Sequence, residues 1–196
     1  MSNGKKIYIL VVLLALAIFF STNVSAADCF NASADPIPIC SCLDLNQTRD
    51  YSSSTFSVQN NIDCSDTINW ESGSGWASIG STSPYFTGTF DGQGYEISGI
   101  HVNRSASNYA GLFGILSNAN VMNVNVVDAH MVGYRYNGIL AGSISGSTVV
   151  ENCSSSGSIN GSYYDLGGLV GYASATINGS SSSAIVQETG SGTGVG

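Results

Sequence analysis

The chain has 196 residues, of which 43% are hydrophobic and only 9% are charged, and its formal net charge at pH 7 is −8. Both lysines, Lys5 and Lys6, lie near the N-terminus, so the chain that follows carries three arginines against 13 acidic residues. Such a chain cannot neutralise a track of phosphates, which excludes nucleic acid as a favoured partner and disfavours anionic lipid surfaces. Abundant Ser, Asn, Thr and Gly with regularly spaced aliphatic residues predict short strands and tight turns.

Residues 1–27 have the pattern of a secretory signal peptide. The two lysines precede an unbroken apolar run from Ile7 to Phe20, and the small residues Val24-Ser25-Ala26 follow. The run is short for a bilayer span, although an uncleaved N-terminal anchor is the alternative interpretation. No second segment of this kind follows. We therefore expect a secreted or cell-surface protein with no membrane contact beyond the signal segment.

Five cysteines follow the signal segment. Cys29, Cys40, Cys42 and Cys64 cluster near its end, and in a secreted chain they predict two disulfides. Three connectivities are open, of which the one containing Cys40–Cys42 is disfavoured by ring strain. A zinc site is the alternative, but the paired C-x-x-C knuckles are missing. Cys153 stands alone and is predicted to be a small buried hydrophobic residue.

Residues 28–75 are predicted to cap the first turn of the fold. Ser41-Cys42-Leu43-Asp44 has the form of a capping box, and a short helix is expected to run to about Arg49. Alternating apolar residues then predict a strand from Phe56 to Cys64. A loop with Trp76 packed inward follows. Residues 76–109 are expected to form the opening coil.

Residues 110–196 contain a repeated phrase with a leucine near a closing glycine. The closing glycines Gly114, Gly142 and Gly171 are almost evenly spaced along the chain. An apolar–x–Asn/Gly step and a third short stretch follow each phrase. The residues assigned to the repeat are Gly111, Leu112, Gly114, Leu140, Gly142, Gly168, Leu169 and Gly171.

Three brief strands repeated every ~28 residues predict one coil of a parallel β-solenoid. The leucines of the phrases should stack inside at intervals of about 4.8 Å. Val121, Val150 and Ile177 should form a second stack, and Asn123 and Asn152 an amide ladder. The flanking glycines suit corners with positive φ or close backbone approach. A β-sandwich is the alternative, and the period is short for a propeller blade.

The succession of these blocks resembles GLUG-motif proteins, which are repeat-bearing secreted and surface proteins of bacteria and archaea. The resemblance rests on Cys42 to Cys64, on Trp76 to Gly80, on Phe86 to Val102 and on the GLFG, ILAG and GLVG phrases. It implies an all-β, right-handed parallel β-helix and a role at the cell surface, and it carries no catalytic motif. The middle phrase departs from the pattern, because Ile139 stands where glycine is expected.

The repeat phase predicts that another phrase begins near Gly196. The last repeat is therefore expected to be cut short, and the chain to be a fragment of a longer array, because a solenoid end normally needs a cap.

Six sequons follow the signal segment and would matter in a host that glycosylates secreted proteins. They begin at Asn31, Asn46, Asn103, Asn152, Asn160 and Asn178.

No catalytic, metal or cofactor site is predicted. A lyase of this architecture would need a base, yet no lysine follows the signal segment; a glycosidase would need paired carboxylates, for which Asp63, Asp66, Glu71 and Asp91 are the available residues. Asp63 and Asp91 suit turns better. His101 and His130 are expected on a solvent-exposed coil face.

Tyrosines recur just before the repeat phrases and form the one candidate binding feature. An aromatic stripe on an edge of the solenoid could dock sugar rings, whereas the alternative is that these rings only pack corners. The candidates are Tyr134, Tyr136, Tyr163 and Tyr164, with Tyr109 in the same pattern. The sequence thus predicts a non-catalytic adhesin, stalk or envelope component that meets glycans or surface proteins, with a secreted carbohydrate-active enzyme as the alternative.

Overall fold

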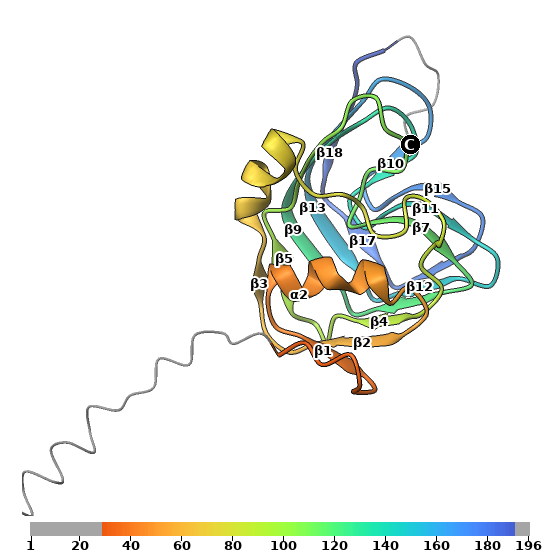
Figure 1. Ribbon diagram of the computed structural model, residues 1–196. Helices are drawn as coiled ribbons and strands as arrows, with labels where there is room; N and C mark the ends of the chain where they lie inside the picture. Colours follow the sequence, from red (N-terminus) through yellow and green to blue (C-terminus); the bar gives the residue numbers. More distant parts are fainter. Residues whose placement is uncertain (1–28, 191–196) are drawn as a thin grey trace, which may run out of the picture.

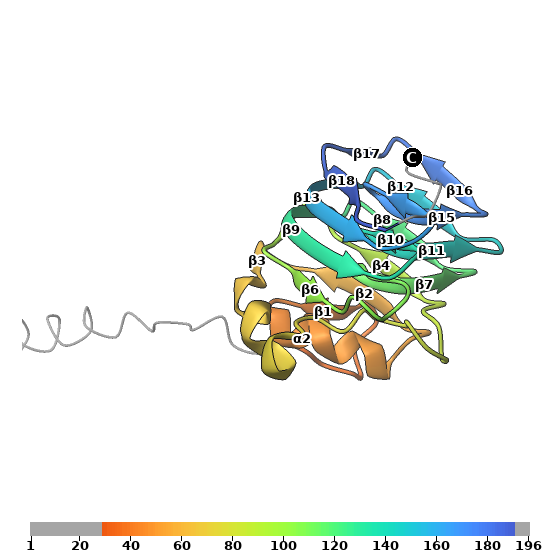
Figure 2. The same ribbon diagram turned by 90° about the horizontal axis from the view of Figure 1, so that it is seen from above.

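The computed structural model describes residues 29–190, which form a parallel β-solenoid with a short N-terminal helix (Figures 1 and 2). Figure 2 shows the coils stacked along one direction, with the N-terminal elements at one end and β16 to β18 at the other. The predicted signal peptide and the predicted interruption at Gly196 lie outside the described residues. Between residues 29 and 190, no helix is long and apolar enough to cross a membrane.

The first sheet contains six parallel strands, in the order β1-β2-β4-β8-β12-β16. Each strand comes from a successive coil, so neighbours in the sheet are far apart in the sequence. The strands are β1 (Ile37–Ile39), β2 (Thr55–Val58), β4 (Thr89–Asp91), β8 (Asn120–Met122), β12 (Val149–Glu151) and β16 (Thr176–Asn178).

The second sheet follows the order β17-β13-β9-β5-β3, with β6 also pairing with β9 and β18 with β13. Its strands are β3 (Ile62–Asp63), β5 (Glu96–Ser98), β6 (His101–Asn103), β9 (Asn125–Gly133), β13 (Ser154–Gly161), β17 (Ser181–Ser182) and β18 (Ile185–Glu188).

The third face is built from the repeat phrases. Three strands pair in the order β15-β11-β7, and a two-stranded sheet pairs β10 with β14, which lie just before β11 and β15 in the chain. Their bounds are β7 (Phe113–Ser117), β10 (Asn137–Gly138), β11 (Ala141–Ser145), β14 (Leu166–Gly167) and β15 (Val170–Ala173). The three faces enclose the core, so the strands of each coil alternate with corners.

The predicted leucine stack is confirmed. Leu112 and Leu140 are fully buried, Leu169 is partly buried, and backbone hydrogen bonds link Phe113 to Leu140 and Leu140 to Leu169. The phrase with Ile139 in place of glycine keeps the same course, and Ile139 is itself buried in the core. Isoleucine at this position, where the pattern expects glycine, therefore adds a buried side chain to the core without changing the course of the coil.

A second column runs through the whole first sheet. The strand registers align Ile37, Phe56, Phe90, Val121, Val150 and Ile177 in successive coils. All of these side chains are buried except that of Ile177 in the last coil, which is 38% exposed. The predicted Val121–Val150–Ile177 stack is therefore confirmed, and it continues into Ile37 and Phe56 of the predicted N-terminal cap, whose strands belong to the same sheet.

The corner after the first sheet explains the apolar–x–Asn/Gly step. Asn123, Asn152 and Gly179 all have left-handed φ values, of 54°, 52° and 57°. Asn and Gly are the residues that adopt this conformation at least cost. The predicted amide ladder is wrong, because the amide of Asn123 donates to the carboxylate of Asp91 in the preceding coil, at 3.0 Å.

The glycines of the phrases serve close approach between coils rather than positive φ. A Cβ on Gly142 would lie 2.5 Å from the Cα of Tyr109, and one on Gly171 would lie 2.6 Å from the backbone nitrogen of Asn137. Left-handed φ values occur just before each phrase instead, at Tyr109, Tyr136 and Asp165.

The N-terminal end carries the predicted capping box. Helix α2 (Cys42–Gln47) begins after Ser41, whose hydroxyl accepts from the backbone of Asp44 while the Asp44 carboxylate accepts from the backbone of Ser41. Two 3-10 segments follow in the chain, η1 (Thr48–Asp50) and η2 (Ser65–Gly73). The predicted strand from Phe56 to Cys64 is broken into β2 and β3, and η2 replaces part of the expected loop before the buried Trp76.

Two disulfides join the four N-terminal cysteines, as Cys29–Cys40 and Cys42–Cys64. The second connects the start of α2 to the chain just after β3. These bonds use the sulfur atoms that a zinc site would need. Cys153 is a buried free cysteine, and desolvation raises the pKa of its thiol.

Candidate functional site

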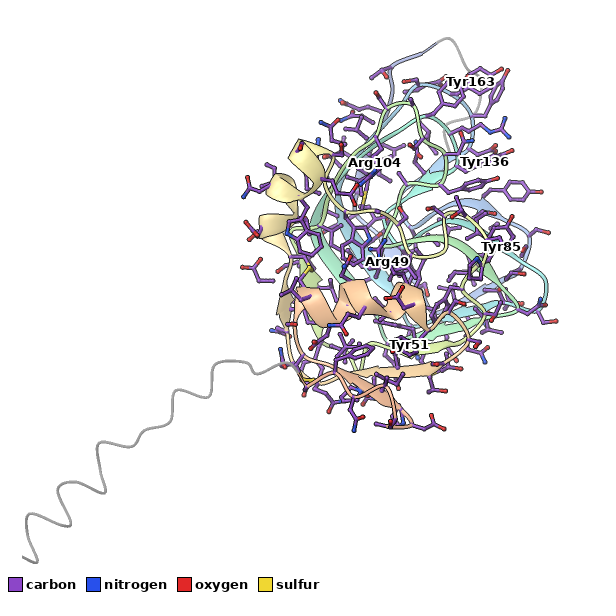
Figure 3. All side chains as sticks on the ribbon, viewed as in Figure 1. Arg49, Tyr51, Tyr85, Arg104, Tyr136 and Tyr163 are labelled. Carbon is purple, nitrogen blue, oxygen red and sulfur yellow. A yellow bond between two sulfur atoms is a disulfide. The ribbon has the colours of Figure 1, made fainter. Side chains whose placement is uncertain are left out.

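The structure brings the predicted tyrosines together where the chain leaves β9 and β13. Tyr134 stacks on Tyr163 with ring centroids 5.2 Å apart, and Tyr109 stacks on Tyr136 at 5.0 Å, both nearly parallel. Tyr164 packs edge-on against Tyr163 at 3.9 Å. We call this group, with Arg135 and Tyr172, the tyrosine patch. Figure 3 shows Tyr136 and Tyr163 among the loops at one end of the view.

Arg135 lies close to both stacks. Its guanidinium carbon is 4.4 Å from the centre of the Tyr136 ring, a cation–π contact. Its Nε is buried and has no hydrogen-bond partner among residues 29–190. Hydrogen bonding to Tyr164 raises the pKa of the Tyr163 hydroxyl, and the charge of Arg135 opposes that shift. Arg135 therefore contacts the ring of Tyr136 in one stack and acts electrostatically on the hydroxyl of Tyr163 in the other.

The patch is accessible from solvent. Tyr134, Tyr164 and Tyr172 are 38%, 36% and 47% exposed. Tyr172 was not predicted, because it follows its repeat phrase; its ring meets Tyr136 edge-on at 5.9 Å. Its position could be found only by aligning β11 with β15, which sets Tyr172 opposite Ser143.

The patch offers chemistry suited to a flat, hydroxyl-rich ligand. Stacked rings cover one another's inner faces, so a ligand meets the outer faces, ring edges and phenolic hydroxyls. Aromatic rings of this kind combine a large apolar surface with a polar tip. Because four of the rings are held by stacking across coils, little side-chain entropy remains to be lost on binding.

Each candidate carboxylate has its own hydrogen-bond or ion-pair partner. Asp63 accepts from the backbone of Ser65 at 2.8 Å, and this bond lowers the pKa of its carboxyl. Asp91 accepts from the backbone of Gln93 and from Asn123. Asp66 accepts from Asn69, and Glu71 pairs with Arg104. Asp63 and Asp91 are thus engaged in turns, as their positions suggested.

The two histidines are stacked instead of standing separately in solvent. Register places His101 beside His130 on β6 and β9, with ring centroids 5.1 Å apart. The Nδ1 of His130 is 2.8 Å from the hydroxyl of Ser158 on the next coil. Burial, and then the nearby charge of His130, lower the pKa of His101.

The histidine pair predicts that stability falls on mild acidification. Because the folded pKa of His101 lies below its unfolded value of about 6.5, the unfolded state binds more protons as the pH drops through that value. The melting temperature should therefore fall between pH 7.5 and pH 5.5. The decrease should be smaller in His101→Gln, and an equal decrease in both proteins would contradict this assignment.

Four of the six sequon asparagines are exposed, at Asn31, Asn103, Asn152 and Asn178, whereas Asn46 and Asn160 are partly buried. Asn46 also accepts from Arg49 at 2.7 Å. The exposed ones are accessible to a glycosylating enzyme.

Comparison with known proteins finds two relatives. The chain is 35% identical to halomucin of Haloquadratum walsbyi over 163 residues, which cover 79% of this chain and 2% of halomucin. It is 29% identical over 115 residues to a Gly-rich membrane protein of Evansella cellulosilytica, covering 56% of this chain and 13% of that protein. The chain thus spans a small part of either relative. No family model and no solved structure matches it.

Proposed function

We propose that this protein is a non-catalytic glycan-binding module of a longer secreted or cell-surface protein. The observation that carries the proposal is the tyrosine patch, in which rings from successive coils stack in register and remain accessible. Rings that served only to pack corners would not need this exposure. A regular coil can repeat such a surface many times, which suits adhesion through many weak contacts.

The proposed location rests on three supports. Structural disulfides are formed and kept in oxidising, extracytoplasmic compartments. The charged segment and apolar run at the N-terminus have the pattern of a secretory signal. The chain also resembles GLUG-motif repeats, and it aligns with short segments of two much longer relatives. A module within a long surface protein accounts for all three.

Binding to polysaccharides tests the proposal. We expect the protein to bind at least one insoluble or immobilised polysaccharide from a panel of cellulose, chitin, xylan, mannan and polygalacturonate. The double variant Tyr134→Ala/Tyr163→Ala should weaken that binding about tenfold, because each aromatic contact contributes about 0.5–1.5 kcal/mol. The matched control is Tyr95→Ala, which removes a similarly exposed tyrosine in the turn before β5.

The same samples separate binding from catalysis. Incubation with each polysaccharide should release no reducing ends above a heat-inactivated sample. Release that is lost in Asp63→Asn or Asp91→Asn would replace the proposal with the enzyme alternative. Absence of binding to the whole panel, or equal binding by the double variant and the wild type, would refute the role of the patch.

A further inference from the structure

A polar groove lies between the N-terminal elements and the opening coil. Two cavities, of about 100 Å³ and about 230 Å³, share Ser78 and Ser81 in their walls and are therefore neighbours. Arg104 lines the smaller cavity and Arg49 the larger. The other walls combine hydroxyl and amide groups, from Thr82, Ser83, Ser107 and Asn108, with apolar groups, from Ala77, Val102, Ala110 and Pro84. Figure 3 labels Arg49 and Arg104, the two arginines that line the cavities.

Both guanidinium groups are held in place by contacts with neighbouring residues. The Nε of Arg104 donates to the carbonyl of Trp76 at 3.1 Å, and its Nη2 donates to the carbonyl of Gly75. Arg49 lies 5.1 Å from the centre of the buried Trp76 ring and donates to Asn46. The groove therefore presents fixed donors rather than mobile surface side chains.

Carboxylates balance these two cations. Glu71 pairs with Arg104 at 2.6 Å, and Asp50 lines the same cavity as Arg49. Burial lowers the pKa of Arg49, and the charges of Glu71 and Asp50 act in the opposite direction. The groove consequently offers both donors and acceptors, and the charges along it are balanced.

The groove and the tyrosine patch are joined by the backbone. The amide of Tyr134 donates to the carbonyl of Ser107 at 2.8 Å, and the amide of Tyr109 donates to the carbonyl of Arg135 at 3.0 Å. Ser107 and Asn108 line the smaller cavity, and Tyr109 follows them directly in the chain. One wall of the groove thus leads into the first ring of the patch.

We infer that the groove extends the glycan site and that the glycan is an uncharged polysaccharide chain. The inference rests on the proposed function. It adds the class of the ligand and its course, which runs from the tyrosine patch into the groove. Paired donors and acceptors bind sugar hydroxyls, which both give and accept hydrogen bonds. An acidic polysaccharide would meet Asp50 in the larger cavity and approach a strongly negative protein, so it is disfavoured.

Oligosaccharide length tests the extension. With neutral oligosaccharides cut from the polysaccharide that binds best, wild-type affinity should rise with length until both patch and groove are filled. Asn108→Trp, which places an indole at an exposed position of the groove wall, should abolish this gain while short oligosaccharides bind as before. Arg104→Gln should reduce the gain. Asn120→Trp, at an exposed position on β8, is the matched control and should behave like the wild type.

The outcomes distinguish failure of the groove from failure of the ligand class and from failure of the proposed function. Length-independent binding in the wild type, or an unchanged gain in Asn108→Trp, overturns the groove and leaves the patch intact. Stronger binding of polygalacturonate than of any neutral chain overturns the ligand class. Failure of every polysaccharide to bind defeats the groove together with the proposed function.

Discussion

Gly142→Val should remove more than about 4 kcal/mol of folding free energy and lower the melting temperature by about 10 °C or more. Any Cβ on Gly142 would lie 2.5 Å from the Cα of Tyr109 and 2.6 Å from the carbonyl oxygen of Tyr136. Both contacts are with backbone, so neither can be relieved by a side-chain rotation. Because Gly142 lies in the central strand of the third face, the coils on either side of it would be forced apart.

The control for this change is Gly94→Asn. Gly94 has a φ of 78°, but apart from Gly94 itself and its two chain neighbours, no atom of the described chain lies within 4 Å of a Cβ placed there. Asparagine tolerates left-handed φ, so this variant should lose about 1 kcal/mol or less. Thermal unfolding followed by far-UV circular dichroism measures both. If Gly142→Val had the same melting temperature as Gly94→Asn, the close approach between coils would not be a requirement of the fold.

Loss of the Cys42–Cys64 disulfide should lower the free energy of unfolding by about 3 kcal/mol. The bond closes a segment with a sequence separation of 22 residues, and it restricts the unfolded chain accordingly. It also ties the start of α2 to the chain just after β3, so its removal releases the constraint between these two N-terminal elements. Cys42→Ala/Cys64→Ala should therefore melt about 5–10 °C below the wild type.

Reductant separates this effect from those of the other cysteines. Wild type treated with reductant should lose at least as much stability as the double variant, because the Cys29–Cys40 bond opens as well. Cys153→Ala should show the same reductant-dependent decrease as the wild type, since Cys153 has no disulfide partner in the described part of the chain. A melting temperature that does not respond to reductant would contradict the structural role of the bonds.

The solenoid could be predicted because its repeat is tied to burial. Leu112, Leu140 and Leu169 recur at nearly constant spacing, and an in-register parallel stack buries the first two fully and the third in part. The column of the first sheet was missed at Phe56 and Phe90, because the intervals from Phe56 to Phe90 and from Phe90 to Val121 are wider than the later period. Because the loops between these strands are longer, the shared core position could not be recognised from the sequence spacing, and only the strand pairing shows it.

The candidate site could be predicted only in part. Tyrosines next to the repeat phrases recur with the period of the coil. Their proximity in space could therefore be predicted from their equivalent positions in successive repeats. The groove had no such signal, because residues 77–84 and 104–110 are brought together by the packing of loops from different coils. Tyr172 and the stacking of His101 on His130 depend likewise on strand register.

The parallel pairing between successive coils bears on how the molecule would respond to tension. Hydrogen bonds between coils run along the stack, so a pull on the two ends loads one interface at a time instead of shearing all of them together. Coils should peel away singly, each releasing about one repeat of chain, or about 95 Å when extended. A tether built of such coils would lengthen in steps and yield gradually rather than break at once.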